Sequence, residues 1–109
     1  MFRVILIALV SSSFLVVGVS AQDSTKGEKI YGEQKCALCH SVGDKGNKKG
    51  PLDDVGSRLK PEEIRQWMVD AAGMTEKTKS ARKPIMKAYS LPKDELDALV
   101  AYMVSLKKK

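Results

Sequence analysis

Apolar residues recur at helical spacing in three separate segments of this chain, so the sequence predicts an all-α fold. The first segment opens at Thr25, because Thr25 and Glu28 are spaced as in a capping box, and it continues through Ile30 and Tyr31. Gly27 within this helix costs up to about 1 kcal/mol relative to alanine. We therefore expect Gly27 to mark a close crossing with another helix.

The second and third segments both begin with a proline followed by acidic residues, a pattern that suits the first turn of a helix. The second opens at Pro61 and ends at Gly73, and its apolar residues are Ile64, Trp67, Met68 and Ala71. The third opens at Pro92 and ends in the lysines 107–109, and its apolar residues are Leu96, Leu99, Val100, Met103 and Val104. We expect these faces, including Met68 and Met103, to form the core.

An apolar run over residues 4–19, interrupted by Ser11, Ser12 and Ser13, follows Arg3 and leads to Val19-Ser20-Ala21, a small-residue cleavage signature. The pattern predicts a signal peptide over residues 1–21 and one domain over residues 22–109, exported to the periplasm or another extracytoplasmic compartment. The alternative is an uncleaved membrane anchor, but sixteen residues fall short of the about 20 that span a bilayer. We expect no membrane span after cleavage.

The most specific chemical signal is Cys36-Ala37-Leu38-Cys39-His40, which contains both cysteines and the one histidine of the chain. On a helical turn, this spacing lets two thiols and an imidazole meet one flat macrocycle. The thiols can form thioethers to a haem, and a neutral ring nitrogen of His40 can bind the iron. A zinc site would need further ligands of these types, and a structural disulfide or dithiol is the remaining alternative. The motif predicts one haem c, attached through Cys36 and Cys39.

Residues 72–91 have weak apolar periodicity and are too many for an ordinary connector in so small a domain. We expect this segment to wrap the far side of the haem and to present the second axial ligand. No second histidine exists, so methionine, lysine, water or a vacant position remain. Met86 is favoured over Met74, because Pro84 stiffens the approach to Met86 whereas Met74 follows a helix end at Gly73. Either methionine could instead be a packing residue.

The chain carries 19 basic and 13 acidic residues, a formal charge of +6 that falls to +5 if Arg3 is removed with the leader. This excess suits redox protein partners with an acidic docking surface. An exported chain with few aromatic residues and no binding motif argues against nucleic acid. A domain this small buries too little surface to be stable unaided and needs a metal, disulfides or a cofactor, and a covalent haem would meet this need.

With these residues identified, the mature chain resembles the class I (monohaem) cytochromes c of the bacterial exported type over nearly all its length. The motifs that carry the resemblance are Gly27 and Tyr31 before the haem, Cys36-Ala37-Leu38-Cys39-His40, Gly50-Pro51-Leu52 and the last helix around Leu99 and Tyr102. The resemblance implies that Gly27 and Tyr31 cross against Leu99 and Tyr102, that the Pro51 carbonyl orients His40, and that Met86 is the second iron ligand.

The resemblance implies a small cytochrome c fold, with three main helices around one covalent haem and iron ligands His40 and Met86. Such a protein is an electron carrier, not an enzyme, between respiratory or dehydrogenase partners. Trp67 is expected to be a wall of the haem pocket, and a hydrogen bond from its indole to a haem propionate stays open. The alternatives are a haem subunit of a larger oxidoreductase complex and a ligand-binding haem sensor with a displaceable sixth ligand.

Lysines in three segments could gather around the exposed haem edge of such a fold and steer an acidic partner, or they could be scattered solvated charges. These are Lys35, Lys48, Lys49, Lys83 and Lys87.

Overall fold

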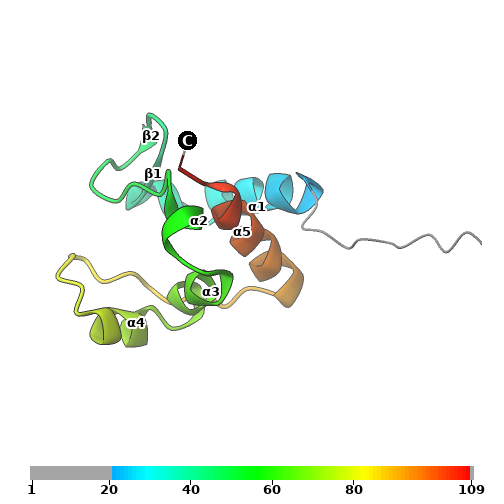
Figure 1. Cartoon of the computed structure of the whole chain (residues 1–109). Helices are drawn as coiled ribbons and strands as arrows, with labels where there is room; N and C mark the ends of the chain where they lie inside the picture. Colours follow the sequence, from blue (N-terminus) through cyan, green and yellow to red (C-terminus); the bar gives the residue numbers. More distant parts are fainter. Residues whose placement is uncertain (1–20, 109) are drawn as a thin grey trace, which may run out of the picture.

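The computed structural model describes residues 21–108 (Figure 1). The predicted signal peptide, except for its last residue Ala21, lies outside the described residues, so its boundary stays a prediction. Within residues 21–108 the chain forms five α-helices, a 3₁₀ turn and a two-stranded antiparallel sheet. The order is α1 (Ala21–Glu33), η1 (Cys36–Leu38), β1 (Ser41–Val42), β2 (Lys45–Gly46), α2 (Val55–Arg58), α3 (Pro61–Val69), α4 (Ala71–Thr78) and α5 (Lys93–Ser105). The predicted all-α fold class is confirmed.

Helices α1 and α5 cross closely and form the main packing contact of the fold (Figure 1). A Cβ added to Gly27 would overlap the Ala98 carbonyl and lie 2.7 Å from the Cβ of Tyr102, so no larger residue fits here without a shift. Close by, the rings of Tyr31 and Tyr102 meet edge to face with centroids 5.6 Å apart. The predicted crossing at Gly27 is confirmed, with Ala98 and Tyr102 as its closest contacts.

The first helix begins at Ala21, so the predicted start at Thr25 is wrong. Contacts with α5 hold the first two turns of this helix in place. The hydroxyl of Ser24 donates to that of Ser105 at 3.2 Å, and the ammonium of Lys26 lies 2.9 Å from the Asp94 carboxylate. Packing against the last helix therefore outweighs the local capping signal.

The predicted second helix is interrupted at Asp70, so its expected end at Gly73 is also wrong. Asp70 has φ −142° and ψ 57°, and its carboxylate accepts a hydrogen bond from the Gly73 N–H at 3.2 Å. Asp70 is thus the N-cap of a new helix, α4, which takes up the first part of the loop expected over residues 72–91.

The last helix ends at Ser105, before the terminal lysines that were expected to belong to it. The chain leaves the helix because it bonds to α2 instead. The Leu106 carbonyl accepts from the Gly56 N–H at 2.7 Å, and the Lys108 N–H donates to the Ser57 hydroxyl at 2.9 Å. This tail ties the C-terminus to the middle of the chain.

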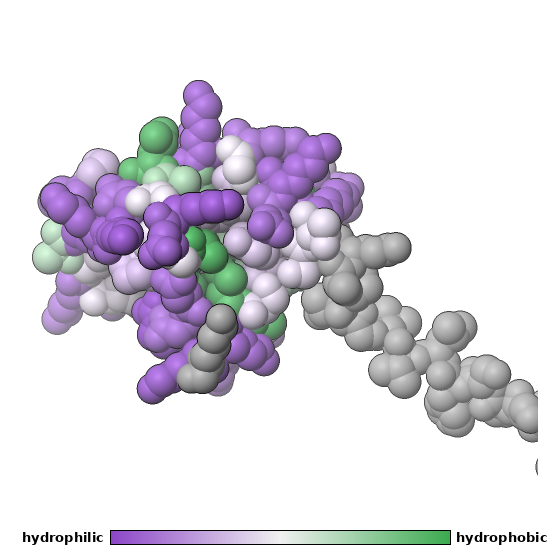
Figure 2. Space-filling view, turned by 90° about the horizontal axis from the view of Figure 1, so that it is seen from above, coloured by the Kyte–Doolittle hydropathy of each residue, from purple (hydrophilic) through white to green (hydrophobic). Residues whose placement is uncertain are grey.

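The core lies where α1, α2, α3 and α5 meet, and it contains Ile30, Tyr31, Val55, Ile64, Met68, Leu99, Val100 and Met103. The prediction that Met68 and Met103 are core residues is confirmed. None of the helices in residues 21–108 is long and apolar enough to cross a membrane. Seen from above, hydrophilic residues cover most of the surface, and a narrow hydrophobic strip runs between them (Figure 2).

Candidate haem site

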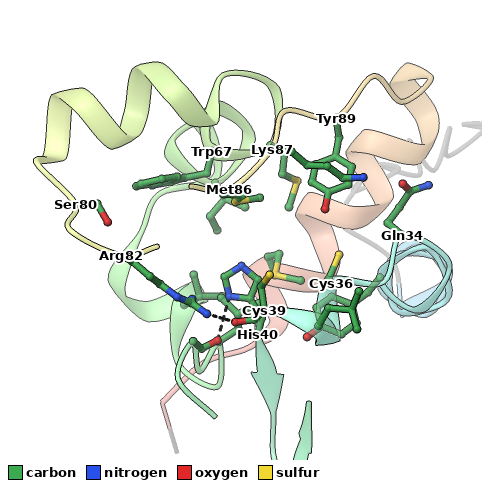
Figure 3. A pocket seen from close by; sticks show the side chains of 18 of the residues that line it. Gln34, Cys36, Cys39, His40, Trp67, Ser80, Arg82, Met86, Lys87 and Tyr89 are labelled. Carbon is green, nitrogen blue, oxygen red and sulfur yellow. Dashed lines mark hydrogen bonds between the residues drawn. The ribbon is translucent and has the colours of Figure 1, made fainter. Parts of the chain in front are cut away.

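A cavity of about 720 Å³ separates the η1 turn from the loop between α4 and α5 (Figure 3). This volume lies in the range of sites that take cofactor-sized ligands. Its apolar lining comes from α2, α3 and α5, which also form the core, and from the residues on either side of α2: Leu52, Val55, Leu59, Ile64, Met68, Leu99 and Met103. The hydrophobic core is therefore open on one side, toward the two cysteines.

The predicted turn over Cys36–His40 is confirmed, and it brings both cysteines to the cavity. Lys35 adopts a left-handed conformation, with φ 57°, that turns the chain out of α1. The N–H groups of Cys39 and His40 then donate to the Cys36 carbonyl at 3.1 and 2.9 Å. Both thiols are free, Cys36 half-buried and Cys39 exposed. Burial raises the pKa of the Cys36 thiol, although the nearby charge of Lys87 opposes this shift.

His40 lies at the edge of the cavity with one ring nitrogen already engaged. Its Nδ1 lies 3.0 Å from the Gly50 carbonyl oxygen. A carbonyl can only accept, so Nδ1 carries the proton and Nε2 keeps a free lone pair. Burial lowers the pKa of His40 and the Arg82 charge adds to this, while the hydrogen bond to Gly50 opposes it. The lowered pKa of His40 favours the neutral imidazole, which is the form that binds iron.

The expectation that the Pro51 carbonyl orients His40 is wrong, because the acceptor is the carbonyl of Gly50. The Ser41 N–H also donates to Gly50, at 3.1 Å, and the Leu52 N–H donates to the Ser41 carbonyl at 2.8 Å. This bridge holds the segment extended, where successive carbonyls point to opposite sides. Pro51 still lines the cavity.

Met86 and Trp67 line the cavity on the side opposite His40 (Figure 3). Both side chains are half-buried. Met74, the other methionine considered as a ligand, is 8% exposed on α4 and is not among the cavity-lining residues. The geometry thus favours Met86, while its bond to iron and the indole hydrogen bond of Trp67 stay predictions.

Several polar residues at this site, namely Arg82, Tyr89, Gln34 and Ser80, carried no signal in the sequence analysis, whereas Lys87 was expected near the haem edge. The Arg82 guanidinium donates to the Cys39 carbonyl, and the Lys87 ammonium lies 5.0 Å from the ring centroid of Tyr89 (Figure 3). Gln34 and Ser80 also line the cavity. Nothing in the sequence separates Arg82 from the other basic residues near Met86, so no sequence signal could have identified it.

The donors around the cavity fit a covalently held haem. They are two free thiols on one rim, a free imidazole lone pair and, across the cavity, a thioether sulfur, all against apolar walls. Tyr31 also lines this cavity, and its hydroxyl is buried with no hydrogen-bond partner in the described part of the chain. Over residues 21–108 no three His, Cys, Asp or Glu side chains gather to hold a bare metal ion.

Comparison with known proteins agrees with this geometry. A protein-family model described as Cytochrome c matches residues 24–107, a range that includes all the site residues above. No curated protein and no solved structure matched the chain.

Proposed function

Because the chain belongs to the cytochrome c family and is thereby a haem-binding electron-transfer protein, we propose that it carries single electrons on one haem c ligated by His40 and Met86. The observation that carries the proposal is the placement of His40 and Met86 on opposite sides of a cavity that both thiols reach. When bound, haem supplies an iron that alternates between the ferrous and ferric states. A histidine–methionine ligand pair favours a raised reduction potential, which suits a carrier.

The chain's own residues would hold, orient and shield the group. Cys36 and Cys39 supply the sulfurs of the two thioethers. The Gly50 carbonyl fixes the tautomer and orientation of His40 through Nδ1, a contact of the kind that tunes a metal site. Trp67 and the apolar side chains of α3 and α5, which line the cavity, would shield the bound group from water. No substrate step is proposed, since the function is transfer of an electron alone.

We further propose that the protein is of the class I, bacterial exported type, with the signal peptide removed. Two neighbouring thiols in an oxidising compartment would ordinarily form a disulfide, and thioether formation consumes them. The excess of lysine supports redox partners with an acidic docking surface. A subunit of a larger oxidoreductase would share all of these features.

Covalent attachment is the first test. After acid extraction in denaturant, haem should remain on the wild-type chain and should be lost from a Cys36→Ala, Cys39→Ala variant. Each single variant should keep one thioether and therefore most of its haem. The apo-protein should be largely unfolded by circular dichroism, because without haem the apolar walls of the cavity face water. A well-folded apo-protein would contradict this account of stability.

Redox titration then separates a carrier from a sensor. A carrier should titrate as one reversible one-electron centre. Its ferrous form should not bind carbon monoxide, because in the proposed ligation Met86 would occupy the sixth position. Ready binding of carbon monoxide by the wild type would favour the ligand-binding sensor instead.

A further inference from the structure

The segment that carries Met86 touches the rest of the protein at few points. Among the twelve residues 79–90, nine are exposed and three are half-buried: Arg82, Met86 and Tyr89. Met86 thus lies four residues after Arg82 and three residues before Tyr89, and these two residues make the contacts that hold the loop on either side of it. The position of its sulfur depends on how firmly these two contacts hold the loop.

The first contact is made by a side chain. The guanidinium of Arg82 reaches across the side of the cavity to the haem-attachment turn and donates to the carbonyl of Cys39 (Figure 3). It fits there because Gly50 has no side chain, since a Cβ on Gly50 would overlap the guanidinium. Arg82 therefore joins the loop of the expected sixth ligand to the segment of the fifth ligand.

The second contact is made by the backbone. The Tyr89 N–H donates to the Met68 carbonyl of α3 at 2.7 Å. This contact is independent of side-chain identity, apart from proline, whereas the Arg82 contact disappears with one substitution. Of the two contacts, only the one made by Arg82 can therefore be removed by a single side-chain substitution.

We propose that Arg82 is a positioning residue, which latches the Met86 loop to the Cys39 carbonyl and so limits how readily an external ligand replaces Met86. The inference rests on the proposed ligation by Met86. Opening the loop requires breaking a hydrogen bond from a charged donor, a stronger bond than one between neutral groups. Its loss should therefore raise the affinity for an external ligand by about tenfold, the lower end expected for such a bond at a half-exposed site.

The test is an imidazole titration of the ferric holoprotein, followed by loss of the methionine-to-iron charge-transfer absorption. Arg82→Gln should bind imidazole about tenfold more tightly than wild type, and Arg82→Lys, which keeps a charged donor, should lie between them. Lys77→Gln removes the same charge from an exposed position on α4 and should behave as wild type. Equal imidazole affinities in Arg82→Gln and Lys77→Gln would overturn the proposal, even if Arg82→Gln were less stable to denaturant.

A double-mutant cycle identifies the route of the effect. In a Met86→Ala background, where imidazole binding is followed by the main haem absorption band instead, Arg82→Gln should leave the imidazole affinity unchanged, because no methionine remains to be displaced. A tenfold effect that persisted there would mean that Arg82 acts on ligand entry and not through Met86. If Arg82→Gln yields no holoprotein, Arg82→Met, which has no side-chain donor at all, takes its place under the same criteria. If Met86→Ala leaves the charge-transfer absorption intact, the proposed ligation fails, separately from the role of Arg82.

Discussion

The crossing of α1 and α5 at Gly27 leads to a prediction in which the same substitution has opposite effects at two positions of one helix. Gly27 faces the Ala98 carbonyl and the Cβ of Tyr102, whereas an added Cβ at Gly32 would meet nothing within 4 Å. Alanine at either position improves helix propensity by up to about 1 kcal/mol, somewhat less at Gly32 because it is next to the helix end. Only at Gly27 must the helices separate to admit the new methyl group.

The magnitude follows from these terms. Overpacking typically costs about 1–3 kcal/mol, and the main obstacle at Gly27 is backbone of α5, which cannot rotate away. After the gain in propensity, Gly27→Ala should lower the free energy of unfolding by up to about 2 kcal/mol. Gly32→Ala should raise it by about 0.5 kcal/mol. The difference between the two variants thus measures the crossing itself, since propensity largely cancels.

The assay is guanidinium chloride unfolding of the haem-loaded protein, followed by far-ultraviolet circular dichroism for the wild type and both variants. Equal stability of the two variants, or a Gly27→Ala variant more stable than wild type, would refute the reasoning. That result would mean that α1 and α5 are not in the close contact described.

Two further predictions concern pH and salt. Burial raises the pKa of Tyr31 to about 12, so the folded protein keeps the phenol neutral where the unfolded chain ionises it, and stability is lost as pH rises from about 10 to about 12. Tyr31→Phe should therefore lose less stability than wild type over that range in the same unfolding assay. Equal losses in the two proteins would contradict the raised pKa of Tyr31. The rate of electron exchange with an acidic partner should fall as salt rises, because surface charges are screened over about 8 Å at physiological ionic strength. Lys49→Glu and Lys87→Glu, both at exposed positions, should slow that exchange without changing the haem spectrum, whereas the control Lys107→Glu in the C-terminal tail should have little effect. If the rate did not change with salt or with either test substitution, the lysines would serve solubility and not docking.

The parts of the site that could be predicted from the sequence are those in which residue type alone determines the chemistry. Two thiols and one imidazole at fixed spacing indicate haem attachment whatever the surrounding fold. Because the chain has no second histidine, methionine becomes the main candidate for the second iron ligand. Gly27 could be predicted because a glycine inside a helix needs a reason, and close packing is the commonest.

What could not be predicted depends on backbone direction and on contacts between distant residues. The choice between the carbonyls of Gly50 and Pro51 depends on which way each peptide faces, and this is set by the bridge to Ser41. The hydrogen bond from Arg82 to Cys39 joins residues 43 positions apart, and nothing in the sequence distinguishes this arginine from the other basic residues.

The most direct test of the central claim is the charge-transfer absorption between methionine and ferric iron, measured in the holoprotein and in two methionine variants. We expect the wild type to show it, Met86→Ala to lose it together with a lowered reduction potential, and Met74→Ala to keep it, because Met74 is packed on α4 away from the cavity lining. An absorption that survives Met86→Ala, or that disappears in Met74→Ala, would contradict the assignment of Met86 as the ligand opposite His40.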